Sequence, residues 1–171
     1  MNQVKIAFFD IDGTLIDMNK KQISQKMLRT LKALQEQNII LCIATGRSPI
    51  TLPDFGDVNF DAFLTFNGSY CFNQEETLYK NPIPRQDINQ IVANARALKR
   101  PVAIATSDQI IANGQDADLI DYFAFARQEV IVSDEFEQLI ANEPVFQVML
   151  GSRQADYAQV MKNTTASQIT A

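Results

Sequence analysis

Three short apolar runs, each followed at once by a polar turn, constrain the fold of the first half of the chain. The runs cover residues 4–9, 39–44 and 62–66 and read VKIAFF, IILCIA and AFLTF. They have the length and composition of buried β-strands, and the first suits a strand buried on both faces of a parallel sheet. Between the first two runs, apolar residues recur at helical spacing after Ser24, a candidate N-cap. This order predicts a doubly wound, Rossmann-like α/β core with a parallel sheet.

Each predicted strand is followed by residues that can handle phosphate or a metal ion. Loops at the carboxyl ends of parallel strands line one crevice, so these residues are expected to meet. Two neighbouring carboxylates can bind Mg²⁺, which relieves their repulsion, and a carboxylate neutralised in this way can attack phosphorus while a second one moves a proton. A threonine hydroxyl and glycine amides can contact phosphate oxygens. The candidate residues are Asp10, Asp12 and Gly13 after the first strand, Thr45, Gly46 and Arg47 after the second, and Asn67 and Gly68 after the third.

Composition removes several classes of function. The 171 residues include no histidine, which excludes Ser-His-Asp and Cys-His catalytic systems. The net charge of -5, without a long basic run, argues against nucleic-acid binding. No apolar stretch is long enough to span a bilayer and residues 1–5 are not a signal peptide, so we expect no membrane association and a cytoplasmic location. Cys42 and Cys71 lie in apolar runs, and we expect them to be buried, reduced thiols.

A change in the residue pattern near residues 70–84 predicts a domain boundary. Residues 69–72 and 77–80 are expected to pair as a hairpin, and a stiff Asn-Pro-Ile-Pro linker follows at residues 81–84. We therefore expect one domain over residues 1–81 and a second, α+β domain over residues 82–171. In the second domain the predicted helices cover residues 87–100, 116–126, 134–141 and 154–162, and the predicted strands cover residues 102–105, 110–112, 145–150 and 166–171.

The stretches DIDGTL, ATGR and FNG together resemble the haloacid dehalogenase superfamily, in its branch of Cof-like sugar-phosphate phosphatases. The resemblance implies that Asp10 is the nucleophile, Asp12 the general acid/base, and Thr45 a ligand of the transferring phosphoryl group. It also implies Mg²⁺ bound by the carboxylate of Asp10 and the backbone carbonyl of Asp12. Residues 82–171 are similar in architecture to the family's cap domain, which covers the site and selects the substrate.

Two parts of the family pattern do not appear in this chain. They are a lysine that steadies nucleophile and phosphate, and a late acidic motif of the form GDxxND. The chain therefore resembles the front part of such a phosphatase, truncated after the cap, with a core that is incomplete at its C-terminal part. Two consequences are expected: weak or absent turnover by this chain alone, and an apolar edge strand at residues 4–9 that invites self-association.

The function expected from the sequence is Mg²⁺-dependent hydrolysis of small phosphorylated metabolites, such as sugar phosphates, through an aspartyl-phosphate intermediate. A phosphomutase that uses the same aspartate is a close variant. The alternative is a non-catalytic fragment that binds phosphorylated ligands or associates with itself. The cap loops carry no motif that identifies the substrate.

Some residues admit a structural interpretation beside the functional one. The Asp-x-Asp-Gly stretch and Thr45-Gly46 are both compatible with simple turns, as is Asn67-Gly68. Arg47 suits a contact to substrate or cap and a surface ion pair equally well. In the second half, Phe123 and Phe125 are expected in the core rather than at a substrate, and Asp116, Asp118 and Asp121 on a solvated helix face.

Overall fold

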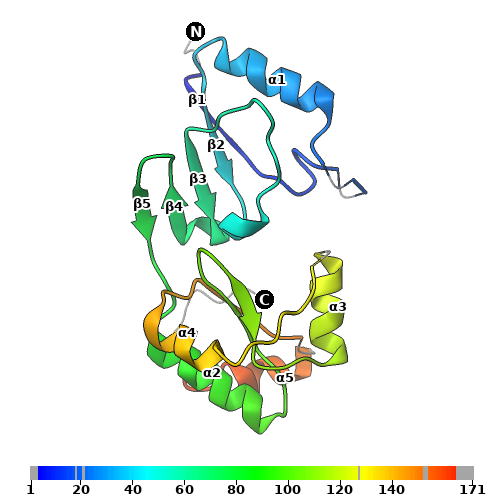
Figure 1. Cartoon of the computed structure of the whole chain (residues 1–171), viewed down its shortest axis with the longest axis vertical. Coiled ribbons are helices and arrows are strands. Elements are labelled where there is room, and N and C mark those ends of the chain that lie inside the picture. The colour runs from blue at the N-terminus through cyan, green and yellow to red at the C-terminus, as the bar shows by residue number, and fades with distance from the viewer. Residues whose placement is uncertain (1–3, 18, 21, 127, 152–153, 165–171) are drawn as a thin grey trace. The chain divides into compact units, whose positions relative to one another are not determined.

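The computed structural model divides the chain into two compact units, Met1–Asn81 and Pro82–Ala171 (Figure 1). It describes residues 4–17, 19–20, 22–126, 128–151 and 154–164. Each unit has its own hydrophobic core and is described by itself.

The first unit is built on a five-stranded sheet in the order β1-β2-β3-β4-β5. Pairing is parallel from β1 to β3 and antiparallel from β3 to β5, so the predicted parallel core and the predicted hairpin are both present. The α/β class is confirmed. The strands are β1 (Ile6–Phe9), β2 (Ile40–Ala44), β3 (Ala62–Thr65), β4 (Tyr70–Phe72) and β5 (Thr77–Lys80). Two 3-10 turns, η1 (Pro49–Thr51) and η2 (Phe66–Gly68), follow β2 and β3.

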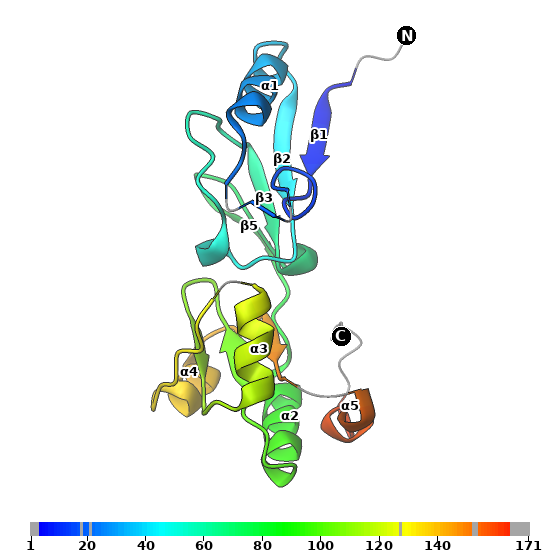
Figure 2. The ribbon, with the colours of Figure 1, turned by 90° about the vertical axis from the view of Figure 1, so that its right-hand side faces the viewer.

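Helix α1 (Gln25–Gln35) covers one face of this sheet (Figure 2). It starts where predicted, because the Ser24 side chain accepts a hydrogen bond of 3.1 Å from the Met27 amide and so satisfies one free donor of the first turn. Its apolar stripe, centred on the buried Leu31, packs in one cluster with Leu41 and Ile43 of β2. Burial of this stripe, rather than helix propensity, holds the helix in place.

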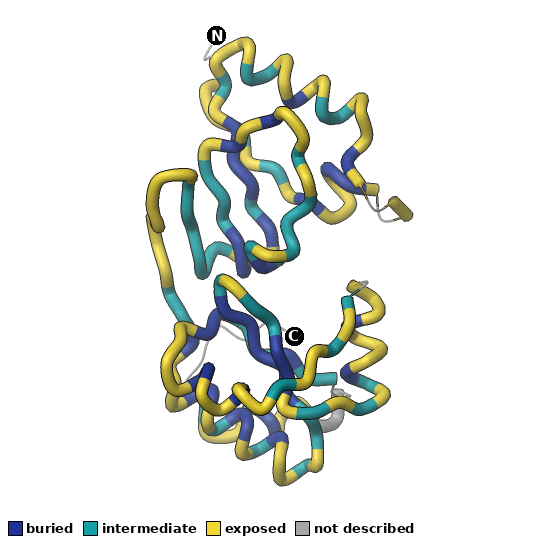
Figure 3. The backbone as a smooth tube through the Cα atoms, in the orientation of Figure 1, coloured by how far each residue is buried: buried dark blue, intermediate teal, exposed yellow. Residues whose placement is uncertain are grey.

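Strand β1 lies at the edge of the sheet, and the expectation of burial on both its faces is wrong. Among the described residues β1 pairs with β2 alone. Successive side chains of a strand alternate between faces. Ala7 and Phe9 therefore pack in the cluster beneath α1, whereas Ile6 and Phe8 point away from it, and Phe8 is 55% exposed. Figure 3 colours the backbone by burial, from buried in dark blue to exposed in yellow.

The second unit combines a small antiparallel sheet with four helices, which agrees with the predicted α+β pattern. Its sheet has the order β7-β6-β8, and helices α2 and α4 share a core cluster with it. Helix α5 packs on α2, where the Asn94 side chain donates to the Val160 carbonyl at 2.8 Å. The predicted strand at residues 166–171 lies outside the described residues. The elements are α2 (Arg85–Ala97), β6 (Ala103–Ala105), β7 (Ile110–Ala112), α3 (Ala117–Phe125), α4 (Phe136–Asn142), β8 (Gln147–Met149) and α5 (Gln154–Val160).

Helix α3 corrects two expectations from the sequence. Phe123 belongs to the core, but Phe125 is 83% exposed, because two residues along a helix turn the side chain to the opposite side. Of the three aspartates expected on a solvated face, Asp121 is exposed, whereas Asp116 and Asp118 are partly buried. Asp116 caps α3 through the Leu119 amide at 2.8 Å, and both carboxylates make ion pairs with the half-buried Arg100, at 3.4 and 2.6 Å.

Both cysteines are free thiols. Cys42 is buried and Cys71 partly buried, and burial raises the pKa of each thiol above its ordinary value. In the part of the chain that the structure describes, no helix has the length and apolar character needed to cross a membrane.

Gly151 packs directly on the first turn of α3, and a substitution at this glycine tests that packing. A Cβ at this position would overlap the backbone of Asp118 and Leu119, so Gly151→Ala requires a backbone shift. We expect the substitution to lower the free energy of unfolding by about 1–3 kcal/mol, as other overpacking changes do. Urea unfolding followed by circular dichroism measures the loss.

Gly114→Ala is the matched control for this measurement. Its added Cβ would lie 3.6 Å from a Pro101 carbon, an ordinary van der Waals distance. Equal unfolding midpoints for the two variants would show that the chain does not approach α3 as described.

Candidate active site

Backbone hydrogen bonds join the loops that follow β2 and β3. The Asn67 amide donates to the Thr45 carbonyl at 3.0 Å, and the Phe66 amide donates to the Arg47 carbonyl at 3.0 Å. The Thr45 amide in turn donates to Leu64 of β3 at 2.9 Å. Two of the three predicted loops therefore meet at the carboxyl end of the parallel strands.

The turn after β3 has an unusual backbone. Phe66, Asn67 and Gly68 have φ values of 49°, 55° and 88°, all in the left-handed region. Glycine and asparagine tolerate this region, but a bulky residue such as phenylalanine adopts it only when its surroundings hold it there. Phe66 is buried, and its amide is bonded to the neighbouring loop. The strain is therefore fixed by the junction of the two loops.

Gly46 lies directly beside the side chain of Asn67. A Cβ on Gly46 would lie 3.1 Å from Asn67 Oδ1, closer than the usual contact. Both residues are exposed, whereas Thr45 is buried and its hydroxyl accepts a hydrogen bond from the Arg47 amide at 3.2 Å. The absence of a side chain at residue 46 thus lets the Asn67 amide group approach the backbone of this loop.

The first loop, which follows β1, is anchored by buried apolar residues. The amides of Leu15 and Ile16 donate to the Ile11 carbonyl at 3.0 and 2.9 Å, and all three side chains are buried. Gly13, with φ of 81°, donates its amide to the Ile16 carbonyl at 2.8 Å. The Gly13 N–H is therefore engaged within the loop, so the predicted approach of that particular amide to phosphate does not fit this geometry.

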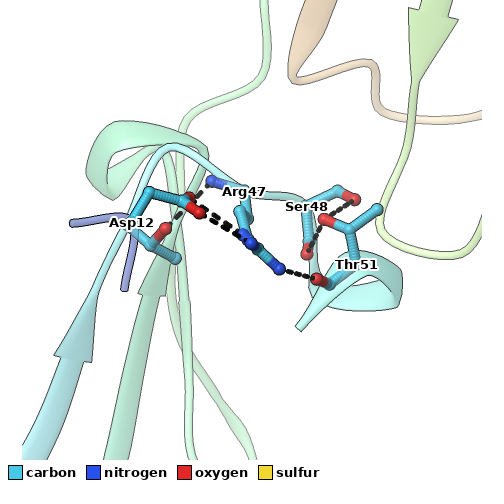
Figure 4. A network of polar contacts seen from close by, with 5 residues as sticks. Asp12, Arg47, Ser48 and Thr51 are labelled. Atoms are coloured by element: carbon cyan, nitrogen blue, oxygen red, sulfur yellow. Dashed lines mark hydrogen bonds and ion pairs between the residues drawn. The ribbon is translucent and has the colours of Figure 1, made fainter. Parts of the chain in front are cut away.

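An ion pair links the first loop to the second. Arg47 donates from Nε to Asp12 Oδ2 at 2.9 Å and from Nη2 to Asp12 Oδ1 at 2.7 Å, and Figure 4 shows the two groups side by side. Of the two interpretations of Arg47, the ion pair is the one present, although both side chains stay partly exposed, at 30% and 49%. An exposed pair of this kind contributes about 1 kcal/mol or less to stability, so its main effect is on orientation.

The charges of the first two loops influence one another. Hydrogen bonding from Arg47 lowers the pKa of Asp12 below its ordinary value, against an opposing effect of burial, and the charge of Arg47 adds to the lowering. The pKa of Arg47 is raised, first by its hydrogen bonds to Asp12 and further by the charges of Asp12 and Asp10. Asp10 thus lies near enough to Arg47 to act on it electrostatically.

Two oxygen donors on the first loop suit a magnesium ion. Asp10 is exposed, and neither its carboxylate nor the Asp12 carbonyl accepts a hydrogen bond from the described residues. Carboxylate and carbonyl oxygens are ligands that Mg²⁺ prefers. The described residues contain no group of three His, Cys, Asp or Glu side chains that could hold a metal. The Asp10 carboxylate and the Asp12 carbonyl are therefore the candidate Mg²⁺ ligands on this loop.

Comparison with known proteins decides the family. The sequence pattern of haloacid dehalogenase-like hydrolases matches residues 7–170. The chain belongs to this family. The haloacid dehalogenase-like chain is 34% identical over 113 residues to YkrA of Bacillus subtilis (strain 168), provisionally named a phosphatase. It is 40% identical over 94 residues to an HMP-PP phosphatase of Klebsiella pneumoniae (strain 342).

These matches cover 66% and 53% of this haloacid dehalogenase-like chain, but only 44% and 32% of the two relatives. Among solved structures, a sugar phosphatase of subclass IIB in the same superfamily has a TM-score of 0.72 and 26% identity. A member of a phosphoryl-transfer superfamily studied for a trigonal-bipyramidal intermediate has a TM-score of 0.77 and 25% identity. Each covers 92% of this chain, which covers 62% of each.

Two residues at the site escaped the sequence interpretation. The Arg47 Nη1 atom donates to the Thr51 carbonyl at 2.8 Å, and the Ser48 and Thr51 hydroxyl oxygens lie 3.0 Å apart. Ser48 and Pro49 begin the short turn η1, in which the Ser48 side chain makes no capping hydrogen bond. No spacing in the sequence indicated that Arg47 would donate a hydrogen bond to the carbonyl at the end of this turn.

The left-handed conformation of Asn67 can be tested by two substitutions that both remove its side-chain amide group. Glycine adopts φ of 55° without steric cost, whereas alanine in the left-handed region is disfavoured by about 1 kcal/mol or slightly more. We expect Asn67→Gly to unfold at the same urea concentration as the unmodified chain, and Asn67→Ala to be about 1 kcal/mol less stable. Equal stability of the two variants would contradict the positive φ at this residue.

Proposed function

We propose that this protein is a Mg²⁺-dependent phosphatase of small phosphorylated metabolites that acts through an aspartyl phosphate on Asp10. The observation that carries the proposal is the convergence of Asp10, the Asp12–Arg47 pair and the Thr45–Gly46 loop at the carboxyl ends of β1 and β2 in a haloacid dehalogenase-like fold. An exposed carboxylate without a hydrogen-bond donor among the described residues is available as a nucleophile.

The proposed reaction has two steps. In the first, a carboxylate oxygen of Asp10 forms a bond to phosphorus while the bond from phosphorus to the leaving oxygen breaks, and Asp12 donates a proton to that oxygen. In the second, water attacks phosphorus, Asp12 takes a proton from the water, and the bond to Asp10 breaks to release phosphate. The lowered pKa of Asp12 favours its ionised form, which is the form that takes the proton in the second step, whereas the first step uses the protonated form.

The remaining residues bind the phosphoryl group in this proposal. The Thr45 hydroxyl, the Gly46 amide and the Asn67 side chain would offer donors to its oxygens, with Gly13 and Gly68 shaping the adjoining turns and Arg47 adding positive charge. Mg²⁺, held by the Asp10 carboxylate and the Asp12 carbonyl, would supply positive charge that offsets the charge of the phosphate.

The substrate class follows from the relatives' names. One relative is an HMP-PP phosphatase and one structural neighbour a sugar phosphatase, so we assign this chain to small phosphorylated metabolites. We assign the second unit, from Pro82 onward, the role of a cap that selects the substrate. The two free thiols accord with a cytoplasmic location.

Turnover by these residues alone is expected to be slow. The described residues lack a third acidic side chain to complete a metal site. Because the charges of metal and phosphate are then not fully balanced, the activation barrier of phosphoryl transfer is higher. Labelling of the nucleophile is therefore a better test than steady-state turnover.

Covalent labelling tests the proposed nucleophile. The chain is incubated with p-nitrophenyl phosphate and Mg²⁺, quenched in acid and reduced with borohydride, which converts an aspartyl phosphate into homoserine. Fragmentation of the tryptic peptide at residues 6–20 should place the change on Asp10. Asp10→Asn is expected to abolish it, whereas Asp17→Asn, a matched change in the same peptide, should leave it intact.

The fate of the phosphoryl group separates the two forms of this chemistry. Release to water identifies a phosphatase, and transfer to a second hydroxyl of an added sugar phosphate identifies a phosphomutase. Equal labelling of the unmodified chain and of Asp10→Asn would refute both.

A second candidate function is self-association through β1, which the exposed edge favours. Edge strands present unpaired backbone groups, and here Val4, Ile6 and Phe8 add exposed apolar side chains on one face. We propose that two copies pair along this strand.

Sedimentation analysis tests this association. Phe8→Lys places a charge on the exposed face of β1 and should shift the chain toward monomer, with the dissociation constant raised about tenfold or more. Ile120→Lys, at an apolar side chain of α3 that is similarly exposed, is the control and should have no effect. Monomeric behaviour of the unmodified chain up to millimolar concentration would rule out this second function.

A further inference from the structure

The guanidinium of Arg47 is held on two sides. Its Nε and Nη2 atoms face the Asp12 carboxylate, and its Nη1 atom donates to the Thr51 carbonyl at 2.8 Å (Figure 4). A partly exposed ion pair does not by itself hold a long side chain in one conformation, because ordering that chain costs entropy. The third hydrogen bond closes the remaining side of the guanidinium and restricts its rotation.

The Thr51 carbonyl is available to Arg47 because η1 stops at this residue. The next residue, Leu52, precedes Pro53 and is extended, with ψ of 141°. A residue before proline is disfavoured in helical conformation, so the turn cannot continue and supply its own donor to this carbonyl. Arg47 takes the place of that donor, and a charged donor strengthens the bond.

Two hydroxyl groups hold the turn in shape. Thr51 Oγ1 donates to the Ser48 carbonyl at 3.0 Å, and the Thr51 amide donates to the same carbonyl at 3.1 Å. Since the Thr51 hydroxyl proton is used there, the Ser48 hydroxyl is the donor in the 3.0 Å contact between the two side chains. Ser48 is only 3% exposed, so this hydrogen bond also satisfies a buried polar group.

We propose that Ser48 and Thr51 are positioning residues: their linked hydroxyls fix the Thr51 carbonyl, which fixes Arg47, which in turn orients the Asp12 carboxylate for proton transfer. The chain of contacts runs from the buried Ser48 side chain to Asp12 without a gap. The catalytic half of this inference rests on the proposed function, and the positioning half stands on the contacts alone.

The positioning half is tested by nuclear magnetic resonance on the full chain, without any substrate. The Nε–Hε signal of Arg47, identified by its loss in Arg47→Lys, reports the bond to Asp12 through its slow exchange with water. Thr51→Val and Ser48→Ala should speed this exchange about five- to tenfold, the size of one lost hydrogen bond. Thr51→Ser, which keeps the hydroxyl, should restore the protection.

Thr30→Val is the matched control, because the Thr30 hydroxyl donates to the Lys26 carbonyl at 3.0 Å on the exposed surface of α1, away from the site. It should leave the Arg47 signal unchanged. Two results would overturn the positioning role. One is fast exchange of the Arg47 signal in the unmodified chain, and the other is an exchange rate in Thr51→Val and Ser48→Ala that equals that of the unmodified chain.

The catalytic half is tested by the rate of Asp10 labelling in the same variants, with an alkyl phosphate in place of p-nitrophenyl phosphate, because an alkoxide needs a proton to leave. Thr51→Val should slow phosphoryl transfer about ten- to a hundredfold at saturating substrate, with substrate affinity unchanged, because a misplaced proton donor affects the reaction step. Faster Arg47 exchange with an unchanged labelling rate would overturn this half. Absence of labelling in the unmodified chain would overturn the proposed function and the catalytic half with it, while the exchange result would still decide the positioning half.

Discussion

The parallel pairing of β1, β2 and β3 is the constraint on which the rest of the site depends. It sends three consecutive strands in the same direction, so that Asp10, Thr45 and the Phe66–Gly68 turn all emerge at one end of the sheet. The hydrogen bonds from Phe66 and Asn67 then tie the second and third loops together, and the Asp12–Arg47 pair ties the first loop to the second. Phosphate chemistry needs such a fixed arrangement of charges, because its catalysis consists largely of positioning and electrostatic stabilisation.

Much of this arrangement could be predicted from residue types alone. Apolar runs of strand length that end in Asp, Thr-Gly and Asn-Gly indicate both the strands and the polar edge, because burial and turn formation are local preferences. The N-cap at Ser24 and the early stop of η1 before Pro53 follow from similarly local rules. The DIDGT stretch, together with ATGR and FNG, indicated the family, and the match over residues 7–170 confirms it.

The features that could not be predicted depend on contacts between distant segments. Arg47 has several partners within the reach of its long side chain, and only the folded chain shows that Asp12 and the Thr51 carbonyl share it. The exposure of Phe8 depends on what covers the face of the sheet opposite α1, and that of Phe125 on a helix rotation that the apolar spacing of α3 left ambiguous. The approach of Gly151 to α3 has no sequence signal, since the glycine and the helix are separated by about thirty residues and meet only in the tertiary structure.

The close contact between Gly46 and the Asn67 side chain has a consequence for engineering and for evolution of the site. Because a side chain at residue 46 would push on the amide group of Asn67, substitutions at the two positions are expected to be coupled rather than additive. Joint variation of both residues opens combinations in which a small residue at 67 makes room for a side chain at 46. Such paired changes widen the range of side chains that this loop can carry.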